Sequence, residues 1–130
     1  MPERLCTFDY ATIRLVPRVE REEFFNVGVI LSCPEHKFLE ARIYLDEEKL
    51  KCFAPDADTE AVRHYLDSIP KICAGTEDAG VIGRLTQRER FYWLTAQRST
   101  IIQSSPVHTG LTADAARMLE HLFEKMVRSK

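Results

Sequence analysis

Five polar side chains stand at positions where their polarity needs an explanation: Arg14, Glu23, Asn26, Arg98 and His108. Arg14 and Asn26 lie inside runs typical of β-strands, while the other three lie in or beside predicted loops. An arginine suits carboxylate or phosphate because its planar guanidinium donates to two oxygens at once. The five residues are therefore a candidate binding set. The alternative for Arg14 and Asn26 is a solvated sheet face with cross-strand pairs.

His108 is the side chain best suited to proton transfer. It precedes Thr109-Gly110, a predicted turn next to a strand end, and could act as a general base if Arg98 or Glu23 approached it. No nucleophile with recognisable spacing accompanies it, and the sequence has no P-loop, dinucleotide-binding turn or nucleophile elbow. A polar histidine in a turn is the simpler interpretation.

The loop from Arg18 to Glu23 is built almost wholly of charged residues, including Glu20 and Glu22. It could bring acid and base groups to a substrate. A solvated loop whose charges pair with one another explains the same pattern more simply.

Basic and aromatic residues alternate between Arg84 and Arg98, a composition that single-stranded nucleic acid binding uses. Helical spacing, however, places Phe91 and Leu94 on a buried stripe and leaves Trp93 as the ring expected to be partly exposed. The formal charge of −2 and the pI near 6.1 also argue against a uniformly basic surface. We therefore do not expect a nucleic-acid partner.

The four cysteines lie about twenty residues apart and form no Cys-x-x-Cys pair. This spacing predicts free thiols in a reducing compartment. Cys33 and His36 have the separation of two zinc ligands, but a zinc site needs three or four ligands of tight geometry, so we expect no metal and no cofactor.

A chain of 130 residues with 45% hydrophobic and 29% charged residues predicts one globular domain over residues 1–130. Its N-terminus lacks an apolar signal segment, and the longest mostly apolar run, Phe24 to Cys33, is too short to cross a bilayer as a helix. We expect a cytoplasmic protein without membrane association.

Alternating apolar residues predict strands over Cys6–Val16, Phe25–Leu31, Leu39–Leu45 and 99–107, the first three forming an antiparallel meander. Helical spacing and capping residues predict a short helix at Lys49–Phe53, a longer one after Asp58, a third from Gln87 to Gln97 and a last one capped by Thr112. Pro70 should kink or end the second helix.

This element order predicts an α+β domain: a four-stranded, mainly antiparallel sheet, made of a β-meander plus one late strand, covered on one face by three or four helices. We expect Ile13, Val27, Val29 and Ile43 to point toward the helices. The other face then collects polar and aromatic residues. They are Tyr10, Thr12, Arg14, Asn26, Gly28, Glu40, Arg42 and Tyr44.

The chain resembles the bacterial family catalogued as domain of unknown function 3037. The resemblance rests on Tyr10-x-x-x-Arg14-x-x-Pro17-x-x-x-Arg21-x-Glu23-x-x-Asn26-Val-Gly28-Val-x-Leu31, on Phe91-x-x-Leu94-x-x-x-Arg98 and on His108-x-Gly110-Leu. It implies a small stand-alone cytosolic bacterial protein, with Arg14, Glu23, Asn26, Arg98 and His108 as copies of the family's polar motif residues. It also implies a protein partner, such as a kinase resembling the toxin HipA encoded nearby.

Two functional hypotheses follow. The first is a non-catalytic interaction or regulatory module. The alternative is an enzyme or ligand-binding protein acting on a phosphorylated or nucleic-acid substrate through Arg14, Arg98 and His108. Convergence of these residues in one concave pocket would favour the alternative, and their dispersal over the sheet would favour the module.

Overall fold

The computed structural model describes residues 4–18, 21, 23–98 and 100–128. Five strands form one antiparallel sheet: β1 (Cys6–Leu15), β2 (Phe25–Cys33), β3 (Phe38–Ile43), β4 (Ile102–Ser104) and β5 (His108–Thr112). The order is β3-β2-β1, and both β4 and β5 pair with the remaining edge of β1. The predicted class, α+β with a mainly antiparallel sheet, is confirmed, with one strand more than expected.

Four α-helices accompany the sheet: α1 (Glu47–Phe53), α2 (Thr59–Ala74), α3 (Gln87–Thr95) and α4 (Ala115–Phe123). The caps of α2 and α3 follow the prediction. The Asp58 carboxylate accepts the Ala61 N–H, and Thr86 and Glu89 form a reciprocal capping box. Pro70 does not end α2, which continues to Ala74. The cap of α4 is Asp114 rather than Thr112.

Short helical turns complete the chain. They are the 3₁₀ turns η2 (Pro34–His36), η3 (Glu77–Ala79) and η4 (Ile82–Arg84), and the π-helical turn η5 (Glu124–Arg128), which extends α4. In the described part of the chain, no helix is both long and apolar enough to span a membrane.

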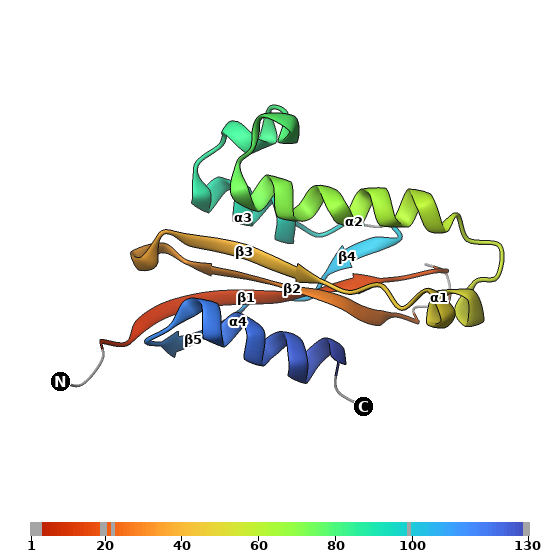
Figure 1. Cartoon of the computed structure of the whole chain (residues 1–130), viewed down its shortest axis with the longest axis horizontal. Helices are drawn as coiled ribbons and strands as arrows, with labels where there is room; N and C mark the ends of the chain where they lie inside the picture. The colour runs from red at the N-terminus through yellow and green to blue at the C-terminus, as the bar shows by residue number, and fades with distance from the viewer. Residues whose placement is uncertain (1–3, 19–20, 22, 99, 129–130) are drawn as a thin grey trace.

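Helices lie on both faces of the sheet (Figure 1). The helices α1, α2 and α3 pack on one face, around Leu50, Leu66, Ile69 and Phe91. The helix α4 packs on the other face through Ala115, Leu119 and Leu122. The face that was expected to be polar and open is therefore covered in part by the C-terminal helix, which is also held by an ion pair between Arg42 of β3 and Glu120.

A β-bulge decides which core each residue of β2 enters. The pairing runs from Ile13↔Gly28 to Arg14↔Asn26, so Val27 and Gly28 together oppose Ile13. This extra residue shifts the alternation by one. Val27 lies in the core under α2, but Val29 lies in the core under α4.

The expectation that Val27 and Val29 share a face is therefore wrong. Leu119 and Leu122 also belong to the second core, so the apolar residues form two clusters separated by the sheet. Gly28 moves to the α2 face, where a Cβ would lie 2.7 Å from the Arg42 carbonyl oxygen. Only glycine fits this approach without displacement of the backbone.

The strand predicted over residues 99–107 is instead two strands on either side of Pro106, and residue 99 lies outside the described residues. Between β4 and β5, the Ser105 hydroxyl accepts the Thr12 N–H at 2.9 Å. Gly110 is a strand residue rather than a turn, because it pairs with Phe8, and a Cβ there would lie 2.8 Å from Cζ of the Phe8 ring. His108 is correspondingly the first residue of β5 and not a turn residue.

Candidate ligand-binding cavity

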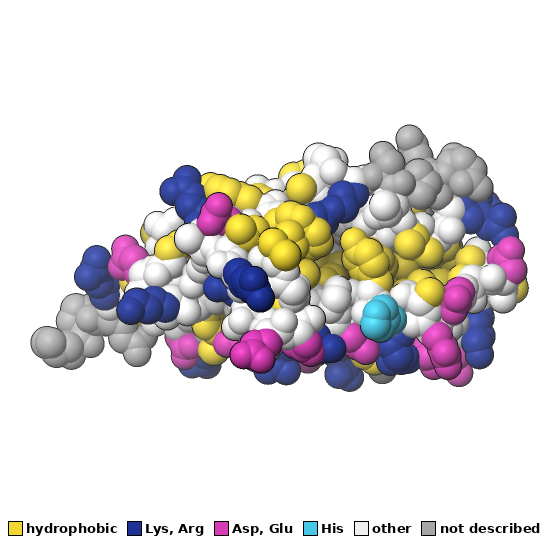
Figure 2. Space-filling view, turned by 90° about the horizontal axis from the view of Figure 1, so that it is seen from above, with side chains coloured by type: hydrophobic (Ala, Val, Ile, Leu, Met, Phe, Trp, Pro, Cys, Tyr) yellow, Lys and Arg dark blue, Asp and Glu magenta, His cyan; other side chains and the backbone are white. Residues whose placement is uncertain are grey.

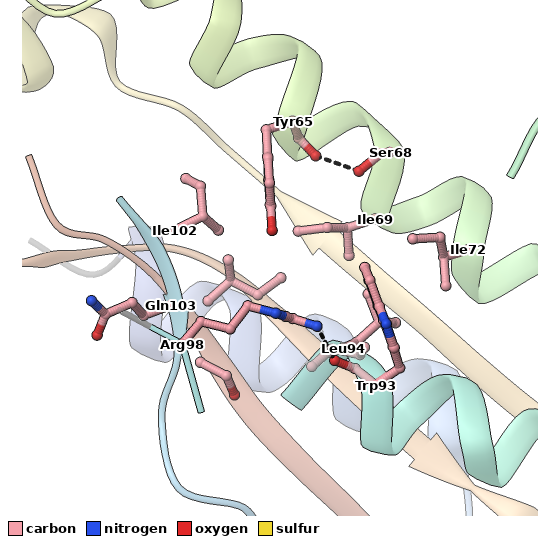
Figure 3. A pocket seen from close by; sticks show the side chains of 12 residues that line it. Tyr65, Ser68, Ile69, Ile72, Trp93, Leu94, Arg98, Ile102 and Gln103 are labelled. Atoms are coloured by element: carbon pink, nitrogen blue, oxygen red, sulfur yellow. Dashed lines mark hydrogen bonds between the residues drawn. The ribbon is translucent and has the colours of Figure 1, made fainter. Parts of the chain in front are cut away.

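A cavity of about 100 Å³ lies between α2, α3 and the β4 side of the sheet (Figure 3). Its walls are mainly aliphatic, with contributions from five elements. The aliphatic lining residues are Ile13, Ile30, Ile69, Ile72, Leu94 and Ile102. The position of Ile69 and Ile72 follows from the helical period of α2, which turns its apolar stripe toward the sheet.

Aromatic and basic side chains form the rim of this cavity. Tyr65 of α2 is 39% exposed and Trp93 of α3 is 37% exposed. The Arg98 guanidinium lies 4.3 Å from the centre of the Trp93 ring, and its Nη2 donates to the Trp93 carbonyl oxygen at 2.5 Å. The last carbonyls of a helix lack intrahelical partners, so Arg98 both caps α3 and rests on its terminal ring.

The hydrogen-bond donors of the rim differ in whether they already have an acceptor. The hydroxyl of Ser68 donates to the Tyr65 carbonyl oxygen, and the hydroxyl of Ser104 donates to the Ser105 carbonyl oxygen. In the described part of the chain, Arg98 donates only to Trp93, and no carboxylate lies within ion-pair distance of it. In Figure 3 the Tyr65 hydroxyl and the Arg98 guanidinium both reach into the space between α2 and α3. The arrangement suits an apolar group that carries an acceptor or a negative charge.

The cavity opens onto a larger apolar surface. Seen from the side of α2 and α3, hydrophobic side chains form a band along the middle of the molecule (Figure 2). A groove of about 430 Å³ adjoins the cavity at Tyr65, which lines both. Val62 and Ile101 also line the groove, and the ion pair between Arg18 and Asp56 spans 3.7 Å beside it.

Arg14 and Asn26 lie on the opposite face of the sheet from this cavity. They are cross-strand neighbours of β1 and β2. The Arg14 guanidinium stacks on Phe24 at 4.2 Å, and the Asn26 amide donates to the Met126 carbonyl oxygen at 3.1 Å. Within the described residues, Nε of Arg14 and Oδ1 of Asn26 are buried without a hydrogen-bond partner.

His108 and Glu23 occupy two further places. The His108 ring lies 5.3 Å from the ring of Tyr10, its cross-strand partner. Tyr10 precedes Arg14 by four residues on the same face of β1, so His108 lies about 13 Å from Arg14 along the strand. Glu23 pairs with Arg21 at 2.8 Å. Glu20 and Glu22 of the charged loop lie outside the described residues. The five candidate residues are therefore brought together only as the pair Arg14 and Asn26, and Arg98 lies across the sheet from them.

The model of a protein family of unknown function, DUF3037, matches residues 10–127. The chain belongs to this family. A search of curated proteins and a search of solved structures found no significant match. The match includes all twelve cavity residues together with Arg14, Asn26 and α4.

Sequence reasoning about this DUF3037 chain missed the structural role of Arg90. Its Nε donates to the Leu85 carbonyl oxygen at 3.0 Å, and its Nη1 donates to those of Ile72 at 2.9 Å and Cys73 at 2.5 Å. Arg90 therefore satisfies the C-terminal carbonyls of α2 and ties α3 to that helix. No local signal distinguishes it from its basic neighbours.

Sequence reasoning also did not identify Tyr65 as a site residue or connect it with Arg98. Trp93 was correctly expected to be partly exposed. The signal that could have linked Trp93 to Arg98 is their position at a helix end, where a basic side chain tends to meet the last carbonyls.

The cysteines are free, and Cys6, Cys33 and Cys73 are buried. Burial raises the pKa of the Cys73 thiol to about 12. The hydrogen bond from Sγ of Cys6 to the Glu35 carboxylate, 3.1 Å long, raises the pKa of Cys6. Both thiols therefore remain protonated and unreactive at neutral pH. Among the described residues, no three His, Cys, Asp or Glu side chains are grouped to hold a metal ion.

Proposed function

We propose that this DUF3037 domain is a non-catalytic binding module whose partner protein docks over the cavity between α2, α3 and β4. The observation that carries the proposal is the composition of the rim. Trp93, Tyr65 and Arg98 surround an apolar depression and remain partly exposed. Trp, Tyr and Arg are the residues that most often dominate the energy of protein interfaces, because they bury large areas around a central pocket.

The dispersal of the polar residues supports a binding module over an enzyme. The catalytic alternative requires Arg14, Arg98 and His108 to act on one substrate. Catalytic groups must lie within hydrogen-bond reach of the same reacting atoms. Arg14 and Arg98 lie on opposite faces of the sheet, and His108 lies about 13 Å along β1 from Arg14.

The size of the cavity supports the same choice. Sites for drug-sized molecules enclose roughly 300–1,000 Å³. A cavity of about 100 Å³ is the size of one side chain and is smaller than the usual site for a nucleotide-sized ligand.

The cellular setting forms part of the proposal. Three buried free cysteines suit a reducing compartment such as the bacterial cytoplasm. We propose a kinase resembling the toxin HipA, the partner expected from the family resemblance, as the first partner to test.

The test compares two matched arginine–aromatic pairs. The Arg98–Trp93 pair lines the cavity, whereas the Arg88–Tyr92 pair, with Arg88 5.3 Å from the Tyr92 ring, lines a separate groove that α3 forms with Asp9 of β1 and Ser32 of β2. Tagged wild type, Trp93→Ala and Tyr92→Ala are produced at native levels in the source cells, and the stoichiometrically bound proteins are identified by mass spectrometry.

We expect wild type and Tyr92→Ala to retain the same partner and Trp93→Ala to lose it. Circular dichroism of each variant establishes that the fold is intact. Equal recovery with all three forms would place the interface elsewhere, and recovery of no stoichiometric protein would refute the binding module.

A further inference from the structure

We infer that the cavity holds the C-terminal residue of a partner chain, with an aliphatic side chain inside the cavity and the terminal carboxylate on Arg98 and the Tyr65 hydroxyl. The choice of a protein as ligand rests on the proposed function. The choice of an aliphatic C-terminal residue rests on three features: the volume of the cavity, the positive charge of Arg98, and the short distance between two subsites, the apolar cavity and the Arg98 guanidinium.

The volume selects an aliphatic side chain. A dry apolar cavity of about 150 Å³ accommodates benzene, so the smaller cavity here favours an aliphatic side chain over a phenylalanine or tryptophan ring. Its walls are mainly isoleucine and leucine side chains, and the hydroxyls of the lining residues Ser68 and Ser104 already donate to backbone oxygens. Leucine, isoleucine, valine or methionine satisfies both conditions.

The charge selects an anion. The guanidinium has five N–H donors, and within the described residues one acceptor is bound. Stacking on Trp93 holds the guanidinium plane at the rim without neutralising it. A carboxylate accepts two parallel N–H bonds from such a group, and the nearby Tyr65 hydroxyl adds a third donor.

The proximity of the two subsites selects a chain end. Trp93 both lines the cavity and supports Arg98, so the carboxylate of the ligand must lie within one residue of its apolar group. In an extended peptide, the side chain that follows an aliphatic residue points to the other side. A terminal carboxylate instead shares its Cα with the aliphatic side chain, and capture of a C-terminal carboxylate is a recurrent mode of peptide recognition.

The adjoining groove leaves room for the preceding residues of the partner. It continues from Tyr65 along α2 past Val62 to the Arg18–Asp56 ion pair. An extended peptide that ends in the cavity therefore has a surface for two or three upstream residues, which a free small acid does not use.

The experiment uses the tryptophan of the site as its reporter. Trp93 is the only tryptophan of the chain, so its fluorescence reports binding at the rim directly. The probe is acetyl-Gly-Ser-Gly-Leu with a free carboxylate, titrated into the full chain, with isothermal calorimetry as a second readout. Matched probes end in leucinamide, alanine or phenylalanine, and N-acetylleucine represents a free small acid.

We expect saturable binding of the Leu-ended peptide and at least about tenfold weaker binding of the amide, because a charge-assisted hydrogen bond is lost. The Ala-ended peptide should bind about 50-fold more weakly, since three buried carbons are missing. The Phe-ended peptide should also bind more weakly, because its ring exceeds the cavity.

Four variants compare residues of the cavity rim with residues of α3 that lie outside the cavity. Arg98→Gln should weaken binding of the Leu-ended peptide about tenfold or more, and Tyr65→Phe should weaken its binding by a smaller factor. Arg88→Gln and Tyr92→Phe should leave it unchanged, and thermal melts establish that all four fold. Equal binding of acid and amide, or equal effects of Arg98→Gln and Arg88→Gln, would overturn the inference.

The outcomes separate this inference from the proposed function. If N-acetylleucine binds as tightly as the peptide, the ligand is a small acid and the inference of a C-terminal residue is wrong. If a partner is captured through Trp93 but the peptide does not bind, only the inference of a C-terminal residue is refuted. If the peptide binds but no partner is captured through Trp93, the proposed partner interface is refuted and the inferred chemistry of the cavity is supported.

Discussion

The side-chain amide of Asn26 donates a hydrogen bond of 3.1 Å to the carbonyl oxygen of Met126, 100 residues further along the chain. The bond joins β2 to η5, the last turn of the C-terminal segment. Asn26, which the sequence suggested as a binding residue, thus helps to hold α4 and η5 on the sheet. Its neighbour Arg14, stacked on Phe24, lies on the same covered face.

Asn26→Ala should destabilise the protein by about 1 to 2 kcal/mol, because the Met126 carbonyl at a partly buried helix end loses its donor. Urea denaturation measures the change. Gln103→Ala is the control, since the amide of Gln103 donates to the Thr100 carbonyl oxygen at an exposed site. A cost equal to that of the control would mean that the bond contributes nothing to the docking of the C-terminal segment.

Val29→Ala should cost roughly 2 to 3 kcal/mol through lost burial and a residual cavity. Because the bulge places Val29 under α4, the substitution should couple with Leu119→Ala in a double-mutant cycle and add independently to Leu66→Ala. Coupling to Leu66 instead of Leu119 would contradict the assignment of Val29 to the second core.

Arg90→Met should destabilise the fold by about 2 to 3 kcal/mol, because three carbonyl oxygens at the end of α2 and in the following turns lose a charged donor. Arg88→Met is the matched control on the same helix, where among the described residues the guanidinium bonds only to the exposed Tyr92 hydroxyl. Thermal or urea melts of the pair decide the point, and similar values would show that Arg90 has no capping role.

Arg14→Gln should lower stability by at most about 1 kcal/mol through the loss of the stack on Phe24. It should leave binding of the Leu-ended peptide unchanged, because Arg14 lies across the sheet from the cavity. Unfolding of this variant would identify Arg14 as a buried structural cation, and weakened peptide binding would mean that the two faces are coupled.

Cys73 should make stability decline at alkaline pH. Burial raises the pKa of its thiol from 9.0 to about 12, so between these values the unfolded chain loses the proton while the folded protein keeps it. The stabilisation is complete below pH 9 and is lost as the pH rises toward 12, at about 1.4 kcal/mol per pH unit from this group.

Urea melts at several alkaline pH values should therefore show a shallower decline for Cys73→Ala than for wild type. Substitution of the exposed Cys52 by alanine should leave the decline unchanged. Parallel declines in wild type and Cys73→Ala would indicate that the Cys73 thiol is not protected by burial.

Local patterns in the sequence were enough to determine most of the elements. Alternating residues predicted the first three strands, and the caps at Asp58 and Thr86 predicted the starts of α2 and α3. These features depend on residues within a few positions of one another, so a linear pattern contains them. Trp93 was also correctly expected to be partly exposed, and Arg98 stays a predicted binding residue.

Only the tertiary structure decided how the two faces of the sheet are used. Alternation assigns residues to a face only along an unbroken strand, and the bulge at Val27 and Gly28 reverses the assignment of Val29 without any change in composition. The same limit applies to α4, whose apolar stripe fits either face, and to the cavity, whose residues come from β1, β2, α2, α3 and the β4 segment. Which residues meet across such distances is set by packing between elements, and local propensity carries no information about it.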